Sequence, residues 1–141
     1  MLDMPRIVPF SSVWIFVSFL LNMKEELKRR TKKIGIDIIR LSEDPPEKLY
    51  AAVICKQLLR CATSIGANYR AACRAKSTAD YINKLKIVEE EADETLYWLE
   101  ISEELDMFDK NKLRKVSMEV NEIVAITVSS IKTLRQKYFR K

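Results

Sequence analysis

The sequence predicts an all-α protein, an antiparallel up-down-up-down bundle of four helices. Only 2 of its 141 residues are Gly and 4 are Pro, so few residues interrupt regular structure. Apolar residues recur every three or four positions through four long segments, as they do on one face of a helix. The length is that of a single domain, and an apolar share of 48% supplies one core. Short connections between the segments favour antiparallel neighbours.

The first helix is expected from about Lys24 to Leu41. Leu27, Ile34 and Ile38 recur there at helical spacing, and charged residues fill the other side. A polar stretch followed by proline, residues 42–46, then ends this helix.

The second helix is expected from Pro45 to about Ala75, with Asp44 as its N-cap and Glu47 completing a capping box. Gly66 lies inside this segment, where a glycine costs up to about 1 kcal/mol relative to alanine. We therefore expect a second helix to approach closely at Gly66.

Local capping signals define the last two helices. Ser77, with Asp80 three residues later, is expected to cap a third helix that runs to about Leu105. Asp109 is expected to cap a fourth helix over residues 110–137. Both helices carry more than one apolar stripe, which is more than an isolated bundle buries, and this favours an oligomer.

Residues 1–22 form an atypical apolar extension, and residues 23–141 form the bundle domain. The stretch from Ile7 to Leu21 is apolar but shorter than the roughly 20 residues that span a bilayer, so no stable membrane span is expected. A single basic residue, Arg6, and the lack of a small-residue cleavage site argue against a signal peptide. Three interpretations stay open: an arm that packs on a partner, a membrane-associating tail, or a mis-assigned start whose true position is Met23.

No reaction centre is visible in the sequence. The chain has no histidine, and its three cysteines lie on one predicted helix, too far apart to pair. Ser64 has no base to activate it. Glu90 and Glu94 share a helix face, but ferritin-like metal sites add histidines to such carboxylates. We therefore expect a reduced, cytoplasmic, non-enzymatic protein with no catalytic residues, metal or cofactor.

The expected topology gathers basic residues at one pole of the bundle. The start of the first helix, the junction of the second and third, and the end of the fourth all meet there, while the other pole has an acidic excess. Residues 24–33 place cations at a helix N-terminus, against the helix dipole. The candidate nucleic-acid-binding residues are Lys56, Arg60, Arg70, Arg74, Lys76, Arg29, Arg30, Lys33, Arg135, Lys137 and Arg140. The net charge of +5 also fits plain solubility, and the basic C-terminal stretch also fits a frayed helix end.

A polar network is expected around the second helix. Ser64 and Asn68 are expected to hydrogen-bond between helices, and Glu90 or Glu94 to pair with Arg60 or with an arginine of a neighbouring chain. Such a network would fix the register of the helices more than it would add stability.

Two segments carry a resemblance to a known family. Residues 60–68 (RCATSIGAN) and 92–100 (ADETLYWLE) resemble the small bacterial four helix bundle proteins, which include those encoded in intervening sequences of 23S ribosomal RNA genes. The resemblance covers about residues 23–138. Where many members read Ile-Ala-Glu-Gly after the asparagine, this chain has Tyr69-Arg70-Ala71-Ala72, which makes the face more basic.

This resemblance implies a four-helix subunit that forms a homopentamer. It also relates the chain to an accessory protein of diversity-generating retroelements, a basic pentameric barrel that binds a reverse transcriptase and nucleic acid. The leading hypothesis is an oligomeric adaptor that binds RNA or single-stranded DNA through the basic pole. The alternative is a protein–protein interaction scaffold that does not bind nucleic acid directly, with a reverse transcriptase or another protein as its partner.

Overall fold

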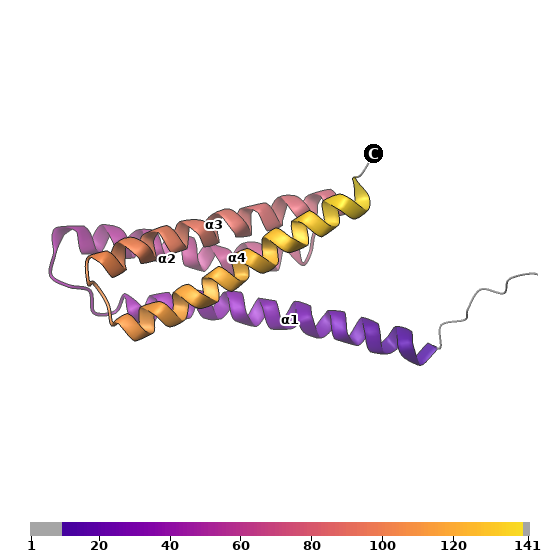
Figure 1. Ribbon diagram of the computed structural model, residues 1–141, viewed down its shortest axis with the longest axis horizontal. Coiled ribbons are helices and arrows are strands. Elements are labelled where there is room, and N and C mark those ends of the chain that lie inside the picture. The colour runs from indigo at the N-terminus through magenta and orange to yellow at the C-terminus, as the bar shows by residue number, and fades with distance from the viewer. Residues whose placement is uncertain (1–9, 140–141) are drawn as a thin grey trace, which may run out of the picture.

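The computed structural model describes residues 10–139 as an antiparallel four-helix bundle (Figure 1), which confirms the predicted fold class. Its helices are α1 (Phe10–Leu41), α2 (Leu49–Ala72), α3 (Thr78–Glu104) and α4 (Lys110–Tyr138). Each helix packs closely on the next one in the chain, whereas α1 and α4 touch only sparsely. The two helices lie near each other where α4 begins and diverge towards its C-terminus (Figure 1).

The core consists of the apolar stripes that the sequence predicts. Ile34, Leu58, Ile65 and Leu99 are fully or almost fully buried in it. Residues 10–139 contain only helices and the connections between them. Each helix supplies one apolar stripe to the core, because side chains three and four residues apart share a helix face.

The predicted starts of the first two helices are wrong. α1 is already helical at Phe10, well before the expected start at Lys24, because no glycine or proline interrupts residues 10–24. α2 begins at Leu49 with Lys48 at its N-cap and has no side-chain capping bond, so the capping box expected at Asp44 does not form. The consecutive prolines explain this difference, since a residue that precedes proline avoids helical geometry.

The caps of the last two helices are confirmed. The Ser77 hydroxyl accepts a hydrogen bond from the Asp80 backbone N–H at 3.1 Å. The Asp109 carboxylate accepts one from the backbone N–H of Lys112 at 2.9 Å. α2, in contrast, ends at Ala72 instead of Ala75.

Glycines let α1 and α2 approach closely, as the sequence predicts at Gly66. A Cβ atom placed at Gly66 would stand 3.2 Å from backbone atoms of Thr31 and Lys32. Gly35 of α1 faces Thr63 of α2 in the same seam.

In the described part of the chain, none of the helices combines the length and hydropathy needed to cross a bilayer.

Candidate nucleic-acid interface

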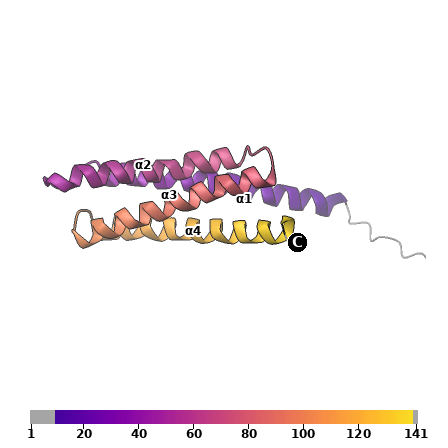
Figure 2. The same cartoon turned by 90° about the horizontal axis from the view of Figure 1, so that it is seen from above.

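Exposed cations gather where α2 and α4 end. Figures 1 and 2 place the α2–α3 connection and the C-terminal end of α4 at the same end of the bundle. We call this region the basic end and define it by Arg70, Arg74, Lys76, Lys132, Arg135 and Lys137. All six side chains are exposed, and none forms an ion pair with another residue in the range 10–139.

Lys24 attaches α1 to this end of the molecule. Its ammonium group donates a hydrogen bond to the backbone carbonyl of Cys73, at the C-terminus of α2, over 3.0 Å. A cation at this position compensates both the unpaired carbonyl and the negative end of the helix dipole. The charge of Lys24 is thus partly used in holding the fold.

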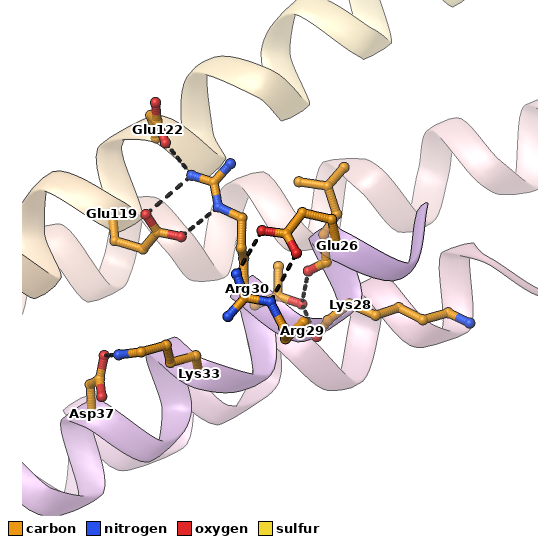
Figure 3. A network of polar contacts seen from close by, with 10 residues as sticks. Glu26, Lys28, Arg29, Arg30, Lys33, Asp37, Glu119 and Glu122 are labelled. Atoms are coloured by element: carbon orange, nitrogen blue, oxygen red, sulfur yellow. Dashed lines mark hydrogen bonds and ion pairs between the residues drawn. The ribbon is translucent and has the colours of Figure 1, made fainter. Parts of the chain in front are cut away.

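The α1 cations that the sequence assigned to the same pole are engaged in ion pairs (Figure 3). Arg29 pairs with Glu26 one turn earlier at 2.6 Å, and Lys33 pairs with Asp37. Because α1 begins before residue 24, these residues lie part of the way along a long helix instead of at its start. The structure does not bring them together with the basic end as unpaired charges.

Arg30 joins α1 to α4. Its guanidinium donates to both carboxylate oxygens of Glu119, at 2.7 and 3.1 Å, and also to Glu122 (Figure 3). The side chain is only 19% exposed. These hydrogen bonds, those to Glu119 first, raise the pKa of Arg30, so its charge is fixed. A forked pair of this kind provides a specific contact between two helices that otherwise touch little.

The remaining candidate nucleic-acid-binding residues also differ in whether they form ion pairs. Lys56 is exposed and forms no ion pair with a described residue, but it lies near the start of α2, away from the basic end. Arg60 pairs with Glu94 and, at 3.4 Å, with Glu91. Arg140 lies outside the described residues.

Of the two acids expected to pair with Arg60, Glu94 does so and Glu90 does not. Glu91, not Glu90, is the second carboxylate that Arg60 contacts, because Glu91 and Glu94 are the partly buried acids on the α3 face beside α2. The indole N–H of Trp98 also donates to Glu94, at 3.3 Å. Arg60 lowers the pKa of Glu94 through its hydrogen bond, whereas burial raises the pKa of Glu91.

The expected hydrogen bonds of Ser64 and Asn68 between helices are also wrong. The Ser64 hydroxyl donates to the Arg60 carbonyl at 2.8 Å, and the Asn68 amide donates to the Ser64 carbonyl at 2.9 Å. Both bonds run back one turn within α2, the partner that a short polar side chain on a helix finds most readily.

The titratable groups inside the bundle are structural. Burial raises the pKa of the Cys61 thiol, which keeps it protonated and unreactive. Burial also raises the pKa values of Tyr69 and Tyr81. Across residues 10–139, no three side chains of the types His, Cys, Asp and Glu are placed to share a metal ion.

An open groove of about 610 Å³ adjoins the basic end. It lies between the first half of α1, the α2–α3 connection and the last turns of α4, where α1 and α4 diverge. Its walls include Leu20, Tyr69, Tyr81, Leu134 and Tyr138. The helical periodicity gave no sign of this groove, because the divergence of two helices is a tertiary feature.

Comparison with known proteins identifies the family. The sequence model of the family described as "23S rRNA-intervening sequence protein" matches residues 23–129. A solved structure from Bacteroides thetaiotaomicron VPI-5482, a protein of unknown function from the S23 ribosomal protein family, is 35% identical. That match covers 77% of this chain and 97% of the other, with a TM-score of 0.70. No curated protein matches. The resemblance of residues 60–68 and 92–100 is thereby confirmed, and the chain belongs to the 23S rRNA-intervening sequence protein family.

Proposed function

We propose that this protein is a non-enzymatic, cytoplasmic, oligomeric adaptor that binds structured RNA through its basic end. The observation that carries the proposal is the separation of the cations into two groups. Arg30 and Arg60 are held by carboxylates within the bundle. Arg70, Arg74 and Arg135, in contrast, are exposed and form no ion pair within the described chain.

Unpaired cations at one end suit a polyanion. Each phosphate that such a cation neutralises releases a condensed counterion, and this release drives binding. Two exposed aromatic side chains, Tyr138 and Phe139, lie beside these cations at the end of α4, with the Lys137 ammonium 5.3 Å from the Tyr138 ring centre. Aromatic rings next to cations suit unpaired bases in loops or single strands. The matched family is described by reference to 23S rRNA, which makes RNA the first ligand to test.

Oligomer formation would strengthen this binding. Exposed apolar side chains lie on the outer faces of α2, α3 and α4, among them Val53, Tyr97, Met118 and Val128. We call these outer faces the flanks. Copies joined through the flanks would present several basic ends together, and their combined affinity for RNA would exceed that of one subunit. The family resemblance supports a ring of five subunits.

A second candidate function rests on the same exposed flanks. A scaffold that binds another protein, such as a reverse transcriptase, would use Val53, Tyr97 and Met118 for contact. Its basic charge would then serve only to steer the partner or to order the subunits.

Binding of labelled RNA at increasing salt tests the proposal. We would measure the fluorescence anisotropy of an RNA hairpin, a single-stranded DNA and a duplex DNA with the full chain. Four to six phosphate contacts predict a loss of affinity of about 10²- to 10³-fold between roughly 50 and 200 mM salt. If the chain binds none of the three nucleic acids at low salt, the RNA-binding proposal fails and the protein-binding scaffold becomes the favoured function.

A further inference from the structure

An open groove lies between the start of α3 and the end of α4. The two helices pack side by side, and α3 begins at the end of the bundle where α4 ends (Figures 1 and 2). The groove has a volume of about 400 Å³ and is lined by Ala79, Ile82 and Asn83 of α3 and by Arg135 and Phe139 of α4. We call it the α3–α4 groove. It belongs to the basic end, because Arg135 is one of the residues that define that region.

Helical spacing explains why these residues line one groove. Ala79, Ile82 and Asn83 are three and four positions apart, so they share one face of α3. Arg135 and Phe139 are four positions apart at the end of α4, and the backbone N–H of Phe139 donates to the carbonyl of Arg135 over 3.0 Å. This bond holds the Phe139 backbone one turn beyond Arg135.

The groove combines apolar surface with two polar groups that the fold does not use. Ile82 is buried in the core and forms a fixed floor, whereas the Phe139 ring is 56% exposed. The amide of Asn83 and the guanidinium of Arg135 are exposed, and neither forms a hydrogen bond or ion pair with another residue in the range 10–139. A ligand in the groove therefore meets an aromatic face, an amide and a cation.

The charges around the groove favour an anionic ligand. Residues 132–141 contain no acid, and Asp80 is the one acid in residues 77–88. The Asp80 carboxylate contacts the Lys84 ammonium at 2.6 Å and accepts a hydrogen bond from the backbone N–H of Lys76 at 3.0 Å. An anion at Arg135 therefore faces no unpaired carboxylate from these two segments.

We propose that the α3–α4 groove binds one unpaired adenine of the RNA, an inference that rests on the proposed function and deepens it. The base stacks on the Phe139 ring, its polar edge faces the Asn83 amide across the groove, and its phosphate contacts Arg135. Tyr138 lines the larger groove beside α1 instead, so the two exposed aromatic side chains at the end of α4 serve different sites.

The amide of Asn83 selects adenine among the four bases. A side-chain amide places a donor beside an acceptor. Adenine has the complementary pair on both of its polar edges, N6 with N7 and N6 with N1. Guanine has it on one edge only, because its other edge presents two acceptors, O6 and N7. A pyrimidine also has only one such edge, and its smaller ring stacks less extensively on Phe139.

Arg135 has a different role from Asn83 in this arrangement. Its guanidinium neutralises a phosphate whichever base is present, so it adds affinity without sequence preference. Lys132 lies three positions earlier on the same side of α4, next to the path of the neighbouring phosphate. The amide contact therefore sets the preference for adenine, and the cations set the salt-dependent part of the affinity.

Binding of RNA hairpins that differ in one loop nucleotide tests the inference. The hairpins share a stem and a loop of uridines in which the central nucleotide is adenine, guanine, cytosine, uracil or an abasic site, so the number of phosphates is constant. We expect fluorescence anisotropy with the full chain to show that the adenine loop binds at least about 5-fold more tightly than the others, the lower limit for a bidentate amide–adenine contact.

Substitutions of exposed residues separate the base contact from the phosphate contact. Asn83→Ala and Phe139→Leu should each reduce the preference for adenine and leave the salt dependence unchanged. Arg135→Gln should weaken the binding of every hairpin and reduce the slope of log affinity against log salt by about 1. Asn111→Ala is the matched control, because Asn111 is an exposed asparagine in the first turn of α4, at the opposite end, and it should behave like the wild type.

The outcomes distinguish this inference from the RNA function on which it rests. Equal affinities of the wild type for all five loops would overturn the adenine site and leave RNA binding standing. A preference for guanine would also overturn it, because arginine pairs with the O6 and N7 atoms of guanine and Arg135 would then be the residue that reads the base. An unchanged adenine preference in Asn83→Ala would overturn it as well. If no hairpin binds at low salt, the proposed function itself fails, and the adenine site fails with it.

Discussion

Gly66 of α2 lies directly against the backbone of Thr31 of α1. A Cβ atom at Gly66 would stand 3.2 Å from the carbonyl carbon and oxygen of Thr31, whereas one at Gly35 would stand 3.4 Å from the nearest atoms of Thr63. The first contact involves backbone that cannot move aside, and the second is an ordinary contact distance. The two glycines of the chain therefore differ in how much space surrounds them.

Gly66→Ala and Gly35→Ala should have opposite effects on stability. Alanine gains about 1 kcal/mol over glycine inside a helix. At Gly66 overpacking against α1, at about 1–3 kcal/mol, outweighs this gain, so we expect a net loss of up to about 2 kcal/mol in the free energy of unfolding. At Gly35 we expect no loss or a gain of up to about 1 kcal/mol. Urea unfolding of both variants measures the difference, and equal effects would contradict the close approach at Gly66.

Arg30→Met should loosen the contact between α1 and α4. The substitution removes the forked pair with Glu119 and leaves the carboxylates of Glu119 and Glu122, one turn apart on α4, without the cation that they share. We expect a loss of about 1–2 kcal/mol in the free energy of unfolding.

Arg29→Met is the matched control for Arg30→Met. Arg29 lies next along the same helix and, among residues 10–139, pairs with Glu26 alone, with both side chains more than half exposed. No measurable change is expected there, because exposed pairs are screened by solvent. A loss at Arg29 as large as that at Arg30 would show that net charge, not the contact with α4, matters.

Acid should destabilise the bundle partly through Glu94. The hydrogen bond from Arg60 holds the pKa of Glu94 below its ordinary value of 4.5. A lowered pKa in the folded state adds stability above about pH 4.5, and this stability is lost as the pH falls through the lower folded value. We therefore expect Glu94→Gln to unfold with a shallower loss of stability in acid than the wild type. Glu90→Gln, at an exposed acid without an ion pair in the described chain, should follow the wild type in a pH series of urea unfolding curves.

Burial acts in the opposite direction at Glu91. It raises the pKa of Glu91, so the stability linked to this group is greatest in acid and falls as the pH rises through the folded value. Glu91→Gln should therefore gain stability relative to the wild type at neutral pH. A marked loss at neutral pH would mean that the contact with Arg60 outweighs burial.

A chain that begins at Met23 should fold with nearly unchanged stability. The large apolar side chains of residues 13–21 are substantially exposed and lie outside the core, so their removal deletes little buried surface. Denaturant unfolding of residues 23–141 should give a free energy within about 1 kcal/mol of the full chain. A larger loss would show that the residues before Met23 stabilise the bundle itself. The intact mass of the native protein separately tests one of the three interpretations of residues 1–22, that translation starts at Met23.

The sequence predicted the features that depend on near neighbours. Ser77 and Asp109 cap α3 and α4 as expected, because each cap bonds to a backbone N–H three residues away. The close approach at Gly66 was also predictable, because glycine is unfavourable inside a helix and a tight contact with a second helix is a common reason for its presence there. Asp44 was misleading, since its capping pattern was strong but the second proline disfavours helical geometry at Pro45, and α2 begins only after Lys48.

Features that depend on how the helices pack against one another could not be predicted from the sequence. Sequence spacing could not show that Arg30 reaches Glu119 on α4, or that Glu91 instead of Glu90 faces Arg60. The set of candidate interface residues is therefore smaller than the sequence predicted. Cations that looked equivalent in the sequence are either paired or unpaired in the fold. Arg70 and Arg74 remained at the basic end, and the α1 candidates did not.

The most direct test of the account reverses charges at the basic end and compares RNA binding with a matched control. Arg70→Glu with Arg74→Glu changes two unpaired cations there, and Lys112→Glu with Lys115→Glu makes the same change in charge in the first turns of α4, at the opposite end. We predict that the first variant loses at least about 100-fold in affinity for an RNA hairpin at low salt, and that the control loses no more than a few-fold. Equal losses in the two variants, or no loss in the first, would contradict the claim that this protein binds RNA through its basic end.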